Sequence, residues 1–466
     1  MNTIEVAGSS LTGTHYISEL AATGSPNQHL FPLTAQVNSK GYLEIGGCDV
    51  IDLVQQFGSP LYILDENTLR TACRQYRDAF KQYYPGNSQV LYGSKAWSCK
   101  AICAIVTNEG LGIDVMSGGE LYTALQAGAK PEMIYFHGNN KSFAELKLAI
   151  ESGCTIVIDN WLELHTLVDI AKEPASTQRT IQVMLRMNPG IEPHTHKHIS
   201  TGQVDSKFGF DSNQIDEVFA FVKQNNSLSC TGLHIHLGSQ IFELTAYQLL
   251  ADVMIGWLSK SVDYGLSIKA INIGGGLGIR YTETNIPPSI KDWAKAISEY
   301  VVAACQERKM PLPTIMCEPG RSLIGNAGVT AYTLGSQKEI PEVRTYLAVD
   351  GGMSDNPRPI TYQATNYAII ANRMNAPLTE TITIVGKHCE SGDILFKDVL
   401  LPKTQPNDIL VALGTGAYNY SQSSNYNRVP RPAAILVSQG RAHLIIKRET
   451  YSDLIKHDYL PTHLQN

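Results

Sequence analysis

The sequence has no run of about 18 consecutive apolar residues, which a helix needs to cross a bilayer. It also has no cluster of basic residues, because 37 Lys and Arg are outnumbered by 43 Asp and Glu, for a formal net charge of -6. Proteins that bind a nucleic-acid backbone present a basic surface. We therefore expect neither a membrane protein nor a nucleic-acid-binding protein.

Paired cysteines are also missing. The nine cysteines are scattered, and no two are spaced as Cys-x-x-Cys, so we expect neither a disulfide framework nor a structural zinc site. The first 39 residues contain no Lys or Arg and include Glu5 and Glu19, unlike a secretory signal or an Arg-rich transit peptide. We expect a cytoplasmic protein whose cysteines stay reduced.

A repeating pattern of short apolar runs dominates the first two thirds of the chain. Runs rich in Val and Ile alternate with amphipathic segments, as in βα units around a parallel sheet. The predicted strands are 89–95, 111–115, 132–138, 155–159, 181–188, 232–238, 270–276 and 314–320. Eight such repeats predict an α/β fold with a (β/α)8 TIM-like barrel.

The pattern changes after about residue 325, where strand-like runs follow one another with few helical patterns. This pattern predicts a mostly β C-terminal domain, which we expect to be a Greek-key sandwich or barrel. Two earlier runs, 42–47 and 61–65, are expected to join its sheet. The predicted domains are a flexible extension over 1–35, N-terminal strands of the β domain over 36–66, the barrel over 67–330 and the β domain over 331–466.

Polar side chains stand at the ends of the predicted barrel strands. Active sites of such barrels lie at the carboxyl ends of the strands. The residues there are Lys95, Asp114, His137, Asn139, Asp159, Arg186, His236 and Glu318. Any one of them could have a purely structural role, since Asp and Asn cap helices and shape turns. The convergence of Lys, Arg, His and Glu on one rim points instead to an active site.

The chemistry of these residues suggests a cofactor. A lysine surrounded by a barrel loses its proton more readily than one in water. Its neutral amine can then attack an aldehyde, so Lys95 can capture an aldehyde as a Schiff base. The run GGGLG at 274–278 is no dinucleotide fingerprint, because residue 279 is Ile, but its backbone amides can cradle a phosphate. These features predict pyridoxal phosphate, with Glu318 at the pyridine nitrogen and His236 on the ring face.

Ten motifs, in order, resemble those of the diaminopimelate decarboxylases, within the alanine-racemase-fold group of pyridoxal phosphate decarboxylases. The resemblance covers about residues 41 to 455, and the motifs are FGSPLYILDE, YGSKA, GIDVMSGGEL with ALQAGA, FHGNNKS, NPGIEPHTH with TGQVDSKFG, HIHLGSQ, IGGGLG, EPGR, GKHCESGD and GTGAY. The resemblance implies a carbon-carbon lyase that converts meso-2,6-diaminopimelate to L-lysine and carbon dioxide, the last step of lysine biosynthesis. Trp97 departs from the family pattern, which has a small or amide residue there.

The resemblance also implies roles for individual residues. Lys95 would bond to the cofactor and Cys389 would donate the proton. The cofactor would be held by Lys95, Asp114, Arg186, His236, Ser239, Gly275, Gly276, Glu318, Pro319, Gly320, Arg321 and Tyr418. The substrate would be held by Arg321, Arg358, Tyr362, Glu390 and Tyr418, with the arginines on the distal carboxylate and Glu390 on the distal ammonium. In this family the cysteine and glutamate reach the neighbouring subunit's site, which implies a homodimer with shared sites.

Other interpretations remain open. His234 and His236 on one strand face, with the histidine-rich run 194–198, would suit a metal-dependent TIM-barrel hydrolase, although that run fits a loop over the site better. A racemase would also use Lys95 but needs a second base on the opposite ring face. A non-catalytic cofactor-binding protein could keep the same fold. Decarboxylases of carboxynorspermidine, D-amino acids or carrier-linked glutamate share most of the barrel motifs.

Overall fold

The structure is a computed structural model that describes residues 12–20, 24–173, 180–190 and 206–465. The chain divides into two compact units. The barrel unit comprises Arg70–Ile279 and Ile286–Leu323. The β unit comprises Met1–Leu69, Arg280–Asn285 and Ile324–Asn466. Within the described part of the chain, every helix is too short or too polar to cross a bilayer.

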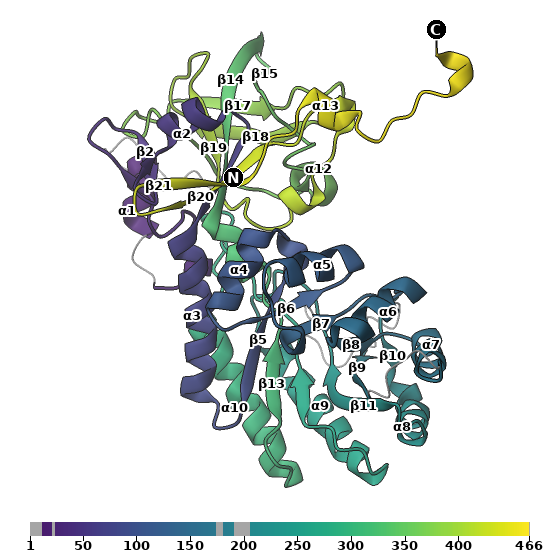
Figure 1. The fold of residues 1–466 in the computed structure, drawn as a ribbon. Coiled ribbons are helices and arrows are strands. Elements are labelled where there is room, and N and C mark those ends of the chain that lie inside the picture. Colours follow the sequence, from purple (N-terminus) through teal and green to yellow (C-terminus); the bar gives the residue numbers. More distant parts are fainter. Residues whose placement is uncertain (1–11, 21–23, 174–179, 191–205, 466) are drawn as a thin grey trace. The chain divides into compact units, whose positions relative to one another are not determined.

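The barrel unit is built on parallel strands that close into a ring (Figure 1). In order around the ring these are β5 (Ser88–Gly93), β6 (Gly112–Val115), β7 (Ile134–Phe136), β8 (Thr155–Ile158), β9 (Ile181–Asn188), β11 (Leu228–His234), β12 (Ala270–Asn272) and β13 (Thr314–Cys317). Strand β13 pairs with β5 and closes the ring, and the short β10 (Phe210–Asp211) adds to β9. The predicted (β/α)8 barrel is confirmed. Most strands end before the predicted residue, because the polar residues at their carboxyl ends lie in loops.

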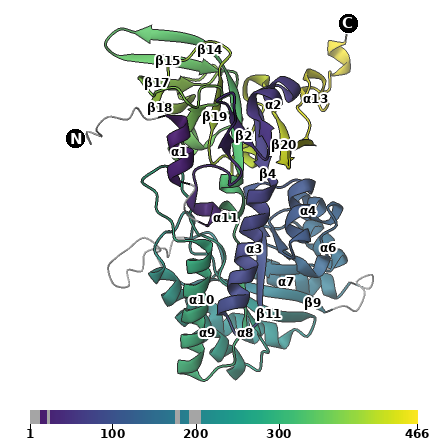
Figure 2. The same cartoon turned by 90° about the vertical axis from the view of Figure 1, so that its left-hand side faces the viewer.

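A helix precedes each barrel strand, and together the helices surround the ring (Figure 2). They are α3 (Glu66–Tyr83), α4 (Lys100–Asn108), α5 (Gly118–Gln126), α6 (Phe143–Ser152), α7 (Trp161–Ala171), α8 (Ile215–Gln224), α9 (Thr245–Asp263) and α10 (Ile290–Arg308). Side-chain caps start several of them: Ser142 and Asn160 accept backbone N–H groups of α6 and α7. Inside the ring, an apolar cluster of Leu91, Tyr135, Val157, Met184 and Met316 fills the barrel.

A buried ion pair connects the loop after β7 to helix α7. Lys141 Nζ lies 3.0 Å from Glu163 Oε1, and their side chains are 1% and 3% exposed. The same ammonium donates to the carbonyl oxygens of Gly138 and Val157 at 2.7 and 2.8 Å. Glu163 Oε2 accepts the backbone N–H of Asp159 at 2.9 Å. The pair therefore fixes the carboxyl ends of β7 and β8, where polar rim residues lie.

The β unit contains a sheet with the strand order β18-β17-β15-β14-β4-β20-β21, to which β16 and β19 are added beside β14. The strands are β4 (Leu61–Asp65), β14 (Gly328–Ile340), β15 (Arg344–Val349), β16 (Ala368–Ile370), β17 (Glu380–Val385), β18 (Ile394–Leu401), β19 (Ile409–Ala412), β20 (Ala433–Ser438) and β21 (Arg441–Ile446). Short helices are α2 (Val50–Phe57), α12 (Arg358–Tyr362) and α13 (Tyr451–Leu454). The mostly β domain is confirmed, and the predicted strand 61–65 joins its sheet as β4 between β14 and β20.

The strand expected over 42–47 does not join this sheet. Its residues form β2, which pairs with two short neighbours in a separate antiparallel sheet of β1 (Gln36–Val37), β2 (Leu43–Ile45) and β3 (Cys48–Asp49). Gly46 and Gly47 adopt φ of 61° and 79°, a left-handed conformation that glycine reaches without strain. The chain therefore turns back after three residues and pairs locally.

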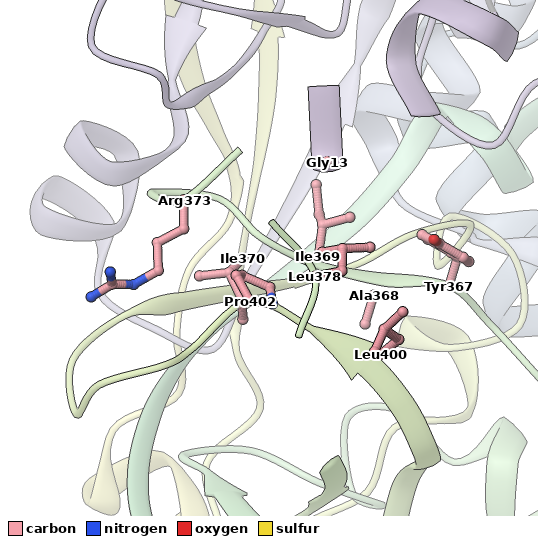
Figure 3. Close-up of a pocket in the computed structure, with 9 residues that line it drawn as sticks. All are labelled: Gly13, Tyr367, Ala368, Ile369, Ile370, Arg373, Leu378, Leu400 and Pro402. Atoms are coloured by element: carbon pink, nitrogen blue, oxygen red, sulfur yellow. The ribbon is translucent and has the colours of Figure 1, made fainter. Parts of the chain in front are cut away.

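Part of the N-terminal extension packs against the β unit, and residues 1–11 and 21–23 lie outside the described residues. Helix α1 (Gly13–Leu20) begins against the β unit, where the backbone N–H of Thr14 donates to the carbonyl oxygen of Met374 at 3.0 Å. Figure 3 shows Gly13 in a small pocket lined also by β16 residues such as Ile369. Leu30 and Phe31 are buried in the core, and this apolar burial offsets the entropy cost of ordering the segment.

Removing the carboxylate of Glu163 should destabilise the barrel unit. The substitution Glu163→Ala leaves the Lys141 ammonium buried without its counter-ion, which costs about 3–5 kcal/mol. As a control, Lys172→Ala breaks an ion pair with Asp169 in which both side chains are more than two-thirds exposed, and the cost should stay below about 1 kcal/mol. Urea unfolding of both variants measures the difference. Equal, small losses would show that the buried pair does not hold these loops.

Candidate active site

Glu318 follows β13, and its carboxylate is buried at the carboxyl end of the barrel. Its Oε1 lies 2.8 Å from His137 Nε2, and its Oε2 lies 3.2 Å from His234 Nε2. Asn272 Nδ2 donates to Oε1 at 2.5 Å. These three groups come from the ends of β7, β11 and β12. His234 and Asn272 supply hydrogen bonds that a buried carboxylate needs.

The surroundings of Glu318 set its charge. Burial alone would raise the pKa of Glu318, but the charges of the nearby His137 and His234 imidazoles outweigh burial and hold that pKa well below its usual value. Burial lowers the pKa of His234 to about 4, although Glu318 opposes this shift. Glu318 is therefore an anion at neutral pH, the state that stabilises a proton on a facing ring nitrogen.

Lys95 and Asp114 lie on the same rim. Asp114 Oδ1 is 3.6 Å from His137 Nε2, and burial raises the pKa of Asp114 to about 6, against the opposing effects of His137 and Lys95. Lys95 lies in the short 3-10 helix η2 (Ser94–Ala96) after β5, and its side chain is exposed. Strand β5 ends at Gly93, so Lys95 stands on the turn that follows the strand, and its role as the amine that captures an aldehyde stays a prediction.

His236 does not share the role of His234, although the two were expected on one strand face. Strand β11 ends at His234, and His236 lies beyond it, where its Nδ1 accepts the backbone N–H of Gly275 at 3.2 Å. Burial lowers the pKa of His236 well below its usual value, and the charge of Lys95 adds to this effect. His236 is therefore a neutral imidazole beside the glycine turn.

The glycine turn 274–276 follows β12 and has no room for side chains. A Cβ atom at Gly275 would collide with the carbonyl oxygen of Glu318, and one at Gly276 would lie 2.6 Å from the Tyr247 hydroxyl. Gly276 also has a φ of 113°, which favours glycine. The turn thus presents bare backbone, as a phosphate-binding cradle requires.

Two neighbouring loops meet beside this turn. Arg321, the first residue of α11 (Arg321–Ile324), donates from Nη2 to Ser239 Oγ at 2.9 Å and from Nε at 3.3 Å. Pro319 and Gly320 lie between Glu318 and Arg321, and both are buried. The predicted phosphate-binding residues therefore lie on the loops after β11, β12 and β13, which are adjacent strands.

Arg186 lies near the end of β9. Its Cζ is 4.2 Å from the centroid of the Phe208 ring, and its Nε is 3.7 Å from Asp159 Oδ1. Arg186, Phe208 and His236 line one pocket. The histidine-rich run 194–198, considered as a source of metal ligands, lies outside the described residues.

Arg358 and Tyr362, two of the predicted substrate residues, are the first and last residues of α12 in the β unit. The Arg358 side chain is buried, with Cζ 4.2 Å from the centroid of the Tyr281 ring. Tyr362 is exposed, and its hydroxyl accepts a hydrogen bond from Gln422 Nε2 at 3.0 Å. Helix α12 therefore holds one charged group in place and presents a hydroxyl to solvent.

Cys389 and Glu390 lie in the loop between β17 and β18, and both are exposed. Of the nine cysteines, all within the described residues, Cys389 is the one classed as exposed. Its backbone N–H donates to Asn427 Oδ1 at 3.0 Å. Tyr418, predicted to touch the cofactor, follows β19 with a φ of 62°. The thiol and the carboxylate can therefore reach a molecule outside the β unit.

His137 and His234 contact Glu318 but were not among the predicted cofactor residues. His137 stands at the end of a predicted strand, and this position could have been used to predict that it belongs to the site. The role of His234 was obscured because it was considered only as a metal ligand. The ligand atoms of His137, His234 and Glu318 do lie within 4.8 Å of one another, a spacing that could also hold a metal ion.

Comparisons with known proteins agree with one another. The family model described as "Pyridoxal-dependent decarboxylase, pyridoxal binding domain" matches residues 66–325. The chain is 57% identical to the diaminopimelate decarboxylase of Synechocystis sp. over 451 residues, which cover 95% of this chain and 96% of that protein. It is 46% identical to that of Bacillus subtilis over 430 residues, 91% of this chain and 97% of the relative. A crystal structure of the M. jannaschii diaminopimelate decarboxylase in co-complex with L-lysine has a TM-score of 0.87 at 33% identity, covering 93% and 99% of the chains.

Asp114 should make the cofactor-free protein less stable as the pH rises. Its pKa is about 6 in the folded protein against 3.8 for an unperturbed aspartate, so folding takes up a proton between these two pH values. The resulting stabilisation is complete below about pH 4 and is lost as the pH rises through about 6. The substitution Asp114→Asn removes this titration.

The free energy of unfolding of the variant should therefore rise relative to that of the wild type between about pH 4 and 6. Above pH 6 it should exceed the wild-type value by a constant amount of at most about 3 kcal/mol, since one pKa unit corresponds to roughly 1.4 kcal/mol. Unfolding temperatures of both cofactor-free proteins from about pH 4 to 8 measure this difference. A difference that does not change with pH would contradict the raised pKa of Asp114.

Proposed function

The chain belongs to the pyridoxal-dependent decarboxylases and, within them, to the diaminopimelate decarboxylases, and from this premise we propose that it converts meso-2,6-diaminopimelate to L-lysine and carbon dioxide. The observation that carries the proposal is 57% identity to a diaminopimelate decarboxylase across 95% of the chain. The arrangement of Glu318 and the glycine turn at the barrel rim supports it.

The residues present fit pyridoxal phosphate. The bare backbone of Gly275 and Gly276, with Ser239, would hold the phosphate, and the anionic Glu318 would face the ring nitrogen. His236, neutral and half-buried beside the glycine turn, would pack on the ring. When bound, the cofactor supplies an aldehyde that bonds to amines and a ring that accepts the electron pair released when a carboxylate leaves.

Five residues would complete the chemistry. Lys95 would offer its amine to the cofactor aldehyde, and Glu318 would keep a proton on the ring nitrogen. Cys389 would deliver a proton to the carbon that has lost carbon dioxide. Arg358 would bind the distal carboxylate of the substrate through paired charge-assisted hydrogen bonds, and Glu390 would bind the distal ammonium. A substrate without the distal carboxylate forgoes these charge-assisted hydrogen bonds, so selectivity can be large.

The remaining assignments follow the same family. Asp114, Arg186, Pro319 and Gly320 would line the cofactor, and Tyr418 would touch both cofactor and substrate. Arg321 would join Arg358 and Tyr362 at the distal carboxylate. Because Cys389 and Glu390 are exposed on the β unit, we infer that they enter the site of a second copy in a homodimer. Nine cysteines without a disulfide support a reducing compartment, and we place the enzyme in the cytoplasm.

A metal-dependent hydrolase has one observation in its favour, the set of donors on His137, His234 and Glu318. That alternative leaves Lys95 and the glycine turn without a role. A racemase or a decarboxylase of a related amino acid would use the same barrel rim. A substrate panel distinguishes these alternatives.

The protein with added pyridoxal phosphate should release carbon dioxide from meso-diaminopimelate and form L-lysine. Lys95→Ala should reduce turnover to background and let the cofactor wash out on gel filtration, because the amine that bonds to it is gone. Lys100→Ala, an exposed lysine in α4, should keep both properties. Normal turnover by Lys95→Ala, or a rate abolished by metal chelation alone, would contradict the proposal.

Two inactive variants should restore activity to each other if sites are shared. In a mixture of Lys95→Ala and Cys389→Ala, half of the dimers are hybrids with one intact site of two, so about a quarter of wild-type activity should return. Subunit exchange is verified with differently tagged chains. If exchange occurs without any recovery, each site is built from one chain.

A further inference from the structure

A buried carboxylate joins the two loops of the β unit that carry the predicted distal-end residues. The arginine loop, residues 350–362, carries Arg358 and Tyr362. The cysteine loop, residues 386–393, carries Cys389 and Glu390. Asp393 ends the cysteine loop, and its side chain is 2% exposed.

The two carboxylate oxygens of Asp393 accept hydrogen bonds from different loops. Oδ1 accepts the backbone N–H of Met353, in the arginine loop, at 2.7 Å. Oδ2 accepts the backbone N–H of His388 at 3.1 Å and lies 2.7 Å from His388 Nδ1, both in the cysteine loop. The His388 side chain is fully buried. One anion therefore links the loops through charge-assisted hydrogen bonds, which are stronger than neutral ones.

Glycines make this close approach possible. A Cβ atom at Gly352 would lie 2.6 Å from His388 Nδ1 and would overlap Asp393 Oδ2, and a Cβ atom at Gly386 would also overlap that oxygen. A parallel backbone link runs from the N–H of Lys387 to the carbonyl oxygen of Gly351 at 2.9 Å. The loops are thus packed so tightly around the carboxylate that its neighbours must lack side chains.

A third segment holds the same pair of loops. The His388 and Tyr426 rings stack with centroids 6.0 Å apart and planes inclined by 24°. Asn427 Oδ1 accepts the backbone N–H of Cys389, and the N–H of Ser424 donates to the carbonyl oxygen of Ser354 at 2.8 Å. The segment 424–427 therefore contacts both loops beside the Asp393 carboxylate.

We propose that Asp393, with His388, is a positioning residue that sets the spacing between the guanidinium of Arg358 and the carboxylate of Glu390. The inference rests on the proposed function, which places these two groups on the carboxylate and the ammonium at the distal end of the substrate. Binding groups displaced by about 1 Å can cost roughly a hundredfold in rate. A carboxylate that touches neither substrate nor cofactor can thus control specificity.

The test compares Asp393→Asn with a matched control. An amide cannot accept through its nitrogen, so a donor from one of the two loops loses its acceptor. The KM for meso-diaminopimelate should rise at least about tenfold, kcat should fall less, and cofactor retention should not change. The control is Asp408→Asn, because the Asp408 carboxylate is also buried in the β unit. It accepts hydrogen bonds from the side chains of Asn372 and Arg373 and from the backbone N–H of Gln405, all of which lie outside both loops. That variant should lose stability but keep its KM.

A second pair of variants decides the question if Asp393→Asn fails to fold. His388→Asn keeps an N–H donor near the Nδ1 position, whereas His388→Ala removes it, so the first should retain a KM closer to wild type. Carbon dioxide release by the wild type is measured first, and its absence would overturn the proposed function. With an active wild type, an unchanged KM in Asp393→Asn, or the same KM in both His388 variants, would overturn the positioning role.

Discussion

The site depends on one constraint, which is that a carboxylate ion must stay charged inside an apolar barrel. Glu318 meets it because the His234 imidazole and the Asn272 amide hydrogen-bond to its oxygens, while the His137 imidazole lies 2.8 Å away. Since these groups stand at the ends of three different strands, they meet around the carboxylate only in the closed ring. Closure of the barrel therefore also assembles the surroundings of the carboxylate that the proposed function places at the cofactor's ring nitrogen.

The β unit uses a buried anion for a different purpose. The Asp393 carboxylate accepts its hydrogen bonds from backbone N–H groups and one imidazole, on loops that carry no strand pairing of their own at these positions. In the barrel, the strands bring the donors to the charge. In the β unit, the charge brings the loops together. This difference explains why glycines crowd around Asp393, because loops can approach a carboxylate closely only where side chains are absent.

Much of this arrangement could be predicted from the sequence, because buried parallel strands such as 181–188 read as near-continuous apolar runs and polar residues follow them. The position of Glu318 at the end of a predicted strand was enough to assign it to the site. The contact between His137 and Glu318 could not be predicted in this way, because β7 and β13 are far apart in the sequence and are not neighbours in the ring. Only the closed ring brings the ends of these two strands together. Strand β18 was not predicted, because Lys397 and Asp398 interrupt its apolar pattern, as an edge strand tolerates. The separate pairing of β2 depended on glycine turns that an apolar run alone does not reveal.

Burial divides the functional residues into two classes. Glu318, His234 and His388 are buried and fixed by hydrogen bonds, whereas Lys95, Cys389 and Glu390 are exposed. Under the proposed function, each of these three exposed groups exchanges a bond, a proton or a ligand in every turnover, so it must be accessible. A group whose task is to keep a charge at one place gains from burial, because its field is stronger where water is excluded and its orientation costs nothing at the moment of reaction. Under the proposed function, the Glu318 charge therefore lies in the interior, and the groups that react in each turnover lie on the surface of each unit. Substitutions in the two classes should be distinguishable by whether they change binding geometry or the chemical step.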